Sequence, residues 1–179
     1  MLDPRAVSSR MALRLPANAE TSAPSATTEV CAVLAIDQAN LLYRACSVCE
    51  KPLPDDPSSL CKYCNLSSFN AGSSGSKRLF RLLMSIATDK KVFTVICFDR
   101  VARIMFGTSA DEFFDFANLH PFAAAAAARI LEGELFRMTL SKPQNGNAQH
   151  LRVTSLVPMR SGYQPVIEGL RELYRARAA

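Results

Sequence analysis

The chain has 179 residues, of which 49% are hydrophobic, so it is long enough for one domain with a substantial core and additional segments. No stretch approaches the roughly eighteen consecutive apolar residues of a membrane-spanning helix, which argues against an integral helical membrane protein. The net charge is +5; residues 77–103 hold seven basic and two acidic side chains, which indicates a polyanion-binding side or, alternatively, ordinary solvated surface charge.

Residues 1–28 are rich in Ser, Ala, Thr and Pro and show no hydrophobic period, which predicts a disordered leader. Scattered arginines with only two acids also fit a mitochondrial or chloroplast transit peptide. The compact apolar core of a secretory signal peptide is missing, so we expect a reducing compartment in which cysteines are free thiols or metal ligands.

The next segment holds two C-x-x-C pairs. Residues 30–36 form an apolar run that predicts a strand, and a second extended piece leads through Tyr43 into the first pair. Two such pairs this close together indicate a tetrahedral zinc site in a ribbon spanning residues 43–69, although disulfides or a redox dithiol are alternatives. The predicted ligands are Cys46, Cys49, Cys61 and Cys64. Four protein ligands leave no open position, so the predicted site is structural.

Two apolar runs flank the sequence "TDKK" and predict a β-hairpin with a basic tip. In the second run Thr94, Ile96 and Phe98 share one face, and the residues between them share the other, including Cys97. Because both faces carry apolar bulk, one is expected to line a core while the other offers a surface to a flat ligand. Cys31 and Cys97 are expected to be buried structural thiols.

After Phe98, apolar residues recur at helical spacing and predict a helix that ends at Gly107. Ser109 and Glu112 match a capping box, which predicts that a second helix starts at Ala110. Pro121 interrupts the helical region, which is predicted to end at Gly133.

A second hairpin surrounds Asn145-Gly146, and the chain closes with an amphipathic helix whose first turn contains Pro165. The predicted fold class is therefore β-dominated: a five-stranded OB barrel over residues 29–160, with an inserted zinc ribbon and a C-terminal helix over residues 161–179. The apolar stripe of that helix fits either a partner subunit or the helix's own barrel.

The strings "LLYRACSVC", "FRLLMSIATD" and "VICFDRVARIMFGTSADEF" resemble the C-terminal DNA-binding domain of the large subunit of replication protein A. The resemblance covers roughly residues 30–160. It implies an OB fold that binds single-stranded DNA, a structural zinc held by the four cysteines, and nuclear work in replication, repair or recombination. It also implies partner subunits that pack against the final helix.

By the same resemblance, Arg81 opens a binding strand and Phe98 stacks on a base. Arg78, Lys90, Lys91 and Arg103 are the additional phosphate contacts expected from the basic region. The sequence departs from the family at Thr94, where a Trp is usual, and the whole chain contains no Trp. The alternative role for Phe98 is a rim residue of the barrel core.

Two functions follow from these observations. The first is a single-strand-binding module, and the alternative is a non-enzymatic interaction module in which DNA contact is weak or absent. An enzyme is not expected, because His120 and His150 lie far from the cysteines in sequence and no phosphate loop or nucleophile motif is recognisable. The sequence leaves open whether DNA or RNA is preferred.

Overall fold

The structure is a computed structural model that describes residues 25–64, 75–143 and 149–178. Within these residues the elements are β1 (Thr27–Ile36), β2 (Leu42–Cys46), β3 (Ser76–Ala87), β4 (Val92–Phe98), α1 (Asp99–Phe106), α2 (Ala110–Leu119), α3 (Ala123–Leu131), β5 (Leu135–Ser141), β6 (Leu151–Pro158) and α4 (Val166–Ala178). None of these helices is long and apolar enough to cross a bilayer.

Five of the strands close into a barrel. β1 pairs with β5 on one side and with β3 on the other, β3 pairs with β4, and β5 pairs with β6, all antiparallel. A parallel pairing between β4 and β6 completes the ring. The helices α1, α2 and α3 lie in the connection between β4 and β5, so the predicted five-stranded OB barrel is confirmed.

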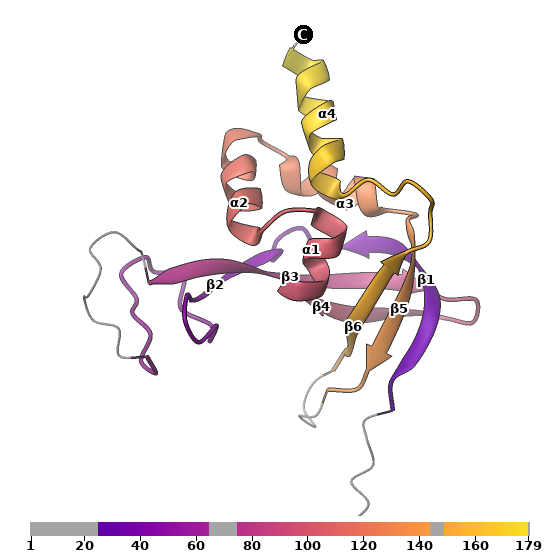
Figure 1. Ribbon diagram of the computed structural model, residues 1–179, viewed down its shortest axis with the longest axis horizontal. Coiled ribbons are helices and arrows are strands. Elements are labelled where there is room, and N and C mark those ends of the chain that lie inside the picture. The colour runs from indigo at the N-terminus through magenta and orange to yellow at the C-terminus, as the bar shows by residue number, and fades with distance from the viewer. Residues whose placement is uncertain (1–24, 65–74, 144–148, 179) are drawn as a thin grey trace, which may run out of the picture.

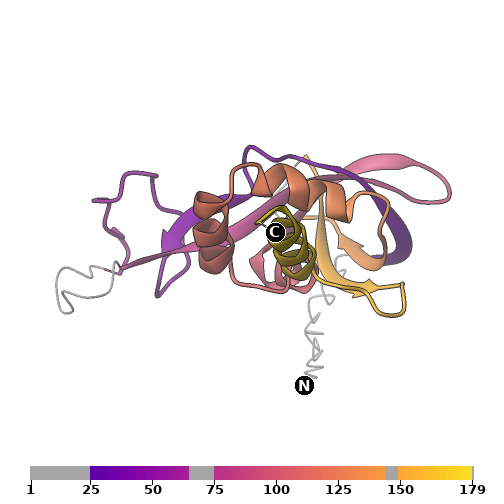
Figure 2. The same cartoon turned by 90° about the horizontal axis from the view of Figure 1, so that it is seen from above.

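The sixth strand, β2, lies outside the barrel. It pairs with residues 76–80 of β3, whereas the other half of β3 pairs with β1. The twelve-residue β3 therefore extends beyond the barrel and forms a two-stranded arm with β2 (Figure 1). The segment with the cysteine pairs lies at the end of this arm. The tip of the β3–β4 hairpin lies at the opposite end of the molecule (Figures 1 and 2).

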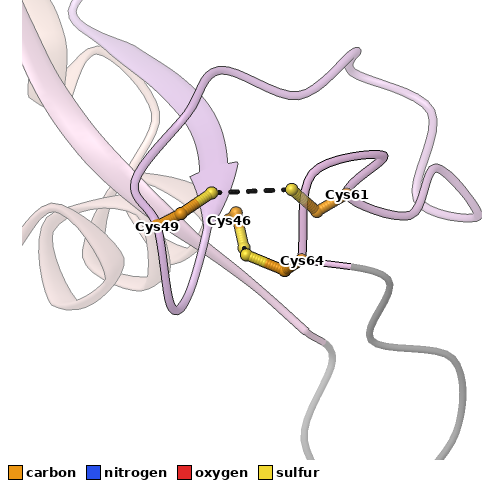
Figure 3. Close-up of side chains that lie close together, drawn as sticks. All are labelled: Cys46, Cys49, Cys61 and Cys64. Carbon is orange, nitrogen blue, oxygen red and sulfur yellow. Dashed lines mark hydrogen bonds between the residues drawn. The ribbon is translucent and has the colours of Figure 1, made fainter.

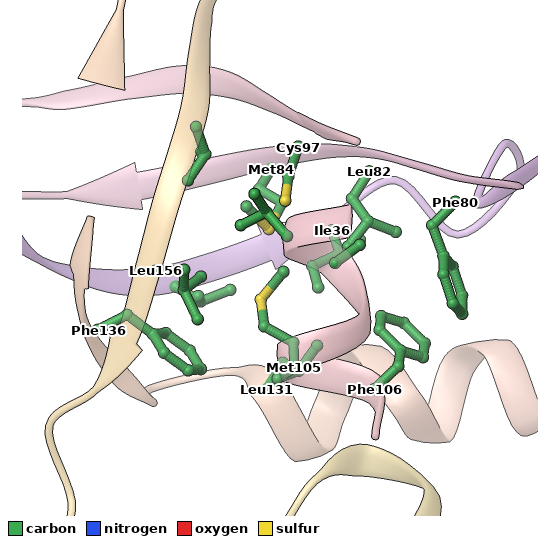
Figure 4. Packing of buried hydrophobic residues seen from close by; sticks show 14 of the residues in the cluster. Ile36, Phe80, Leu82, Met84, Cys97, Met105, Phe106, Leu131, Phe136 and Leu156 are labelled. Atoms are coloured by element: carbon green, nitrogen blue, oxygen red, sulfur yellow. The ribbon is translucent and has the colours of Figure 1, made fainter. Parts of the chain in front are cut away.

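Strict alternation on β3 and β4 builds the barrel core. Leu82, Met84 and Ile86 on β3 and Val95 and Cys97 on β4 are all fully buried, as expected when every second side chain points inward. Met105, Phe106 and Leu131 from the helices close one end of the core (Figure 4). The prediction that Cys31 and Cys97 are buried is confirmed; burial raises the pKa of the Cys97 thiol to about 12, which keeps it protonated.

The helix boundaries are set locally. Gly107 adopts φ 68° and ends α1 as predicted. The predicted capping box is confirmed, since the Ser109 hydroxyl accepts from the Glu112 N–H and the Glu112 carboxylate accepts from the Ser109 N–H. The helical region breaks between α2 and α3 at Pro121, also as predicted.

The final helix packs on its own domain through its first half and through Tyr174. Val166, Ile167 and Leu170 are buried, whereas Arg171 and Arg175 are exposed. Farther along, the Tyr174 hydroxyl donates to the Pro121 carbonyl oxygen at 2.6 Å. The C-terminal part of α4 then rises away from the barrel (Figure 1). The apolar stripe, up to Tyr174, therefore packs against the domain itself.

Parts of the predictions lie at or beyond the limits of the described residues. β1 begins at Thr27, so the last two residues of the predicted 1–28 leader belong to the barrel instead. Residues 1–24 of that leader, residues 65–69 of the predicted ribbon and the Asn145-Gly146 turn lie outside the described residues.

Candidate metal centre and nucleic-acid interface

The four predicted ligands converge at the end of the β2–β3 arm (Figure 3). The Cys46 and Cys64 sulfurs are 3.7 Å apart and the Cys49 and Cys61 sulfurs 3.5 Å apart. All four sulfurs lie within 4.8 Å of one another, and none is in a disulfide. A tetrahedral zinc with Zn–S bonds of about 2.3 Å requires sulfur–sulfur distances of about 3.8 Å. The cluster therefore has the spacing and donor set of a tetrathiolate metal site.

The local backbone favours a thiolate at the first ligand. The N–H groups of Cys49 and Val48 donate to the Cys46 sulfur and lower the pKa of that thiol to about 6. At Cys64, hydrogen bonds with Cys49 and burial are the main causes that raise the pKa, to about 12. One sulfur is thus ionised readily, whereas a full set of four thiolates needs a cation to offset their mutual repulsion.

Arg44 organises the loop between the two cysteine pairs, although no sequence motif marks it for this role. Its guanidinium is largely buried and donates to the carbonyl oxygens of Pro54 (2.6 Å) and Asp56. It also donates to the Pro57 carbonyl oxygen (3.4 Å) and to the Ser76 hydroxyl (3.2 Å). These bonds connect the ribbon loop to both strands of the arm.

The outward face of the barrel brings Arg81 and Phe98 together. They are direct partners in the antiparallel β3–β4 register, and their side chains lie on the face opposite the core. Arg81 is exposed and Phe98 half-buried. The next pairs along the same face are Leu83 with Ile96 and then Ser85 with Thr94. A basic group and an aromatic ring thus stand at one end of a small apolar surface.

β6 adds a second arginine to this surface. Arg152 is the parallel partner of Ile96, and its guanidinium carbon lies 4.3 Å from the centre of the Phe98 ring. The sequence could not indicate this contact, because it depends on the pairing of β6 with β4. Tyr43 on β2 is also on this side, since its partner Leu79 has the same facing on β3 as Arg81.

Arg78 and Arg103, two further predicted contacts, have different surroundings. Arg78 is three residues from Arg81, so it faces the other side of β3, where its guanidinium lies 3.4 Å from the centre of the Phe114 ring. Arg103 on α1 is paired with Asp99 at 2.8 Å. Arg78 is therefore separated from Arg81 and Phe98, whereas Arg103 is held by the carboxylate of Asp99, the residue that follows Phe98 in the chain.

Lys90 and Lys91 are exposed at the tip of the β3–β4 hairpin. The Lys91 ammonium lies 4.8 Å from the centre of the Phe93 ring. Lys91 is seven residue steps from Phe98, or about 23 Å at the usual rise per residue of a strand. These lysines can thus meet only a ligand long enough to run along the hairpin.

The arm and α2 enclose a cleft of about 390 Å³ beside Arg78, and its lining includes Leu42, Tyr43, Arg44 and Phe114. His120 packs against the rings of Phe116 and Tyr174, with ring centres 4.3 and 4.4 Å away, and these two rings also contact each other at 5.7 Å, which is a packing role.

No protein-family model and no curated protein matches the sequence. Among solved structures, the fold is similar to a chain of a replication protein A heterotrimer bound to single-stranded DNA, with a TM-score of 0.62 and 19% identity over 88% of this chain. This chain spans 36% of the length of that one. It is also similar to a chain of yeast replication protein A bound to single-stranded DNA, with a TM-score of 0.57 and 14% identity over 98% of this chain and 100% of the other. The fold implied by the sequence resemblance is confirmed.

Proposed function

We propose that this chain is a single-stranded-DNA-binding module of a replication protein A-like complex, with structural zinc, that acts in the nucleus in replication, repair or recombination. The observation that carries the proposal is the pairing of Arg81 with Phe98 on the outward face of the barrel. The structural likeness to chains of DNA-bound replication protein A supports the same ligand class.

The chemistry of this face suits a strand without base pairs. A ring presents the same flat surface to every base, and a neighbouring guanidinium takes a phosphate without reading the sequence. Leu83 and Ile96 continue the surface with apolar side chains, against which sugars and base edges can pack. Binding is therefore expected to tolerate many sequences and to weaken with salt.

The proposed zinc has a supporting role. When bound to Cys46, Cys49, Cys61 and Cys64, it supplies four bonds that cross-link the ribbon and fix the end of the arm. Arg44 holds the intervening loop in place by hydrogen bonds. With all four positions taken by sulfur, the site has no room for an activated water, in agreement with a binding module.

A salt titration tests the proposal. The affinity of the zinc-loaded chain for an oligothymidylate should fall steeply with salt, and Arg81→Ala should reduce the slope of log K against log salt by about one unit. Arg137→Ala, an exposed arginine on β5, is the matched control and should leave the slope as it is. Negligible affinity at low salt would refute the proposal, and repeating the titration with an RNA oligomer decides between the two nucleic acids.

The interaction module remains the second candidate because of one surface feature. Leu119 and Phe122, at the corner between α2 and α3, are 77% and 81% exposed, and Phe122 adopts φ 67°. Large apolar side chains held in solvent are typical of protein-binding surfaces. If the salt titration shows no binding while Leu119→Ser and Phe122→Ser disrupt assembly with a partner subunit, this second function is the correct one.

A further inference from the structure

The barrel face has a continuation on the β2–β3 arm. Tyr43 pairs with Leu79 across the arm, and Leu79 precedes Arg81 by two residues, so all three side chains have the same facing. Tyr43 is therefore a diagonal neighbour of Arg81 on the same surface. Leu79 itself is only 4% exposed, so its side chain is covered by neighbouring groups on this face.

The surroundings of Tyr43 agree with that placement. Burial raises the pKa of its hydroxyl, the carboxylates of Asp99 and Glu50 raise it further, and the guanidinium groups of Arg81 and Arg152 act in the opposite direction. The Tyr43 hydroxyl is thus within electrostatic reach of both arginines of the barrel face. Part of its side chain remains accessible to a ligand, since the residue is neither buried nor fully exposed.

Arg152 is in a position to exchange partners. Its guanidinium lies over the Phe98 ring at 4.3 Å, on an exposed part of the surface. A base stacked on an aromatic ring is held more strongly than an exposed guanidinium on the same ring. The contact between Arg152 and Phe98 is therefore weaker than the stacking that a base would make on the same ring.

The surface is also long enough for several nucleotides. From Lys77, which pairs with Glu50 of the ribbon at 2.7 Å, to the end of β3 there are ten residue steps, or about 33 Å. Single-strand sites of OB folds extend over about four to sixteen nucleotides. Tyr43 lies between the ribbon and Phe98 on this route.

We propose that Tyr43 and Arg152 belong to the nucleic-acid site, which extends from the barrel onto the arm: Tyr43 stacks on a second base in place of the ring absent at Thr94, and Arg152 moves from Phe98 to a phosphate on binding. The inference rests on the proposed function and assigns it two further contact residues. The ligand remains an unpaired, sequence-tolerant polynucleotide.

Two pairs of variants separate the two roles, measured with a labelled oligothymidylate of about twelve nucleotides. Tyr43→Leu should weaken binding about tenfold without changing the salt slope, because it removes a ring and no charge. Tyr43→Phe should recover most of that loss. Arg152→Ala should lower the salt slope by about one unit, and Arg152→Lys should keep the slope, since it keeps the charge.

A second measurement needs no substitution. Photo-crosslinking of the wild-type chain to an oligomer that carries 5-iodouracil should label both Phe98 and Tyr43, as identified by mass spectrometry of the peptides. Zinc content and thermal melting of each variant confirm that it is folded, and Arg137→Ala serves as the matched arginine control.

The outcomes distinguish this inference from the proposed function. If the wild-type chain binds no oligonucleotide at low salt, both are wrong. If the wild type binds and Arg81→Ala weakens it, while Tyr43→Leu and Arg152→Ala bind like the wild type and crosslinks reach Phe98 alone, then only the extension onto the arm is wrong.

Discussion

The charged side chain of Arg44 is buried next to the ribbon loop, and the residue is only 9% exposed. Its guanidinium donates to three loop carbonyls and a hydroxyl. A buried guanidinium is stable only with such partners, and each partner loses its donor when the side chain is removed. Arg44 is thus the residue on which the shape of the ribbon loop depends.

Arg44→Ala is expected to lower the free energy of unfolding by about 2–3 kcal/mol, because charge-assisted bonds to buried carbonyls are lost. It should also release zinc faster to a chromogenic chelator, since the loop that carries Cys61 loses its anchor. Arg44→Lys retains the charge but lacks the planar guanidinium, so its stability and its rate of zinc release should lie between those of the wild type and Arg44→Ala. A denaturation midpoint and a zinc-release rate equal to those of the wild type would contradict this role.

Glu112 gives a prediction for acid pH. The Ser109 N–H, the Thr108 hydroxyl and the Ser109 hydroxyl donate to its carboxylate and lower its pKa to about 2. The pKa of Glu112 is lower in the folded chain than in the unfolded chain. Its stabilising effect is therefore complete at pH values above the ordinary pKa of a glutamate, and it disappears as the pH falls toward 2. The stability difference between wild type and Glu112→Gln should therefore shrink over that window. Urea titrations at several pH values measure it, and a difference that grows toward acid pH would contradict the capping-box role.

At the scale of the elements, Gly107 is the point where the end of α1 packs against the start of α4. Its φ is 68°, and a Cβ at this position would lie 2.3 Å from the Cβ of Pro165. Gly133 has φ 84°, and a Cβ added there would meet no heavy atom within 4 Å, so it shares the backbone requirement without the crowding. The two glycines form a matched pair.

Gly133→Ala should cost about 1 kcal/mol, from the left-handed backbone alone. Gly107→Ala adds a clash with Pro165 and should cost about 3 kcal/mol, with loosening of α4. Denaturant titrations of both variants provide the comparison. Equal losses would show that α1 and α4 are not packed as described.

Zinc removal should act on one element of the fold. After chelation, amide protection is expected to fall in β2 and in residues 76–80, which form the arm, while β5 and β6 keep their protection because their contacts lie in the barrel. Cys31→Ala, at a buried cysteine outside the cluster, should retain the metal. Unchanged protection of the arm after verified zinc removal would mean that the metal does not hold the ribbon.

The order of the elements was predictable because local signals mark most boundaries, such as Gly107 at the end of α1 and Ser109 before α2. The division of β3 between two partners was not predictable, since it depends on pairings with β1 and β2 that no local pattern encodes. The separation of Arg78 from Arg81 could have been predicted, because side chains three residues apart on a strand point to opposite faces of the sheet.

At the scale of the whole molecule, the metal site was the more predictable of the two sites. Its four ligands lie in two short motifs, so spacing alone identifies them. The barrel face with its continuation on the arm instead combines β2, β3, β4 and β6. Tyr43 is recognisable only once β2 pairs with β3, and Arg152 only once β6 pairs with β4. The alternation of β4 placed Phe98 outward correctly, but it gave no information about the arginine that covers the ring.

The closed barrel also divides the molecule into two sides with different expected partners. The face of Arg81 and Phe98 is proposed for the polynucleotide, while the helical side carries the exposed Leu119 and Phe122 at the corner between α2 and α3. A bound strand and a protein partner therefore need not compete for the same surface.

Following the backbone amide resonances of the zinc-loaded chain while oligothymidylate is added would locate the bound strand residue by residue. The largest shifts are predicted at Arg81, Phe98, Tyr43 and Arg152, with little change along α2 and α4. Shifts confined to the helical side, or none at oligomer concentrations well above those of the protein, would contradict binding at the barrel face.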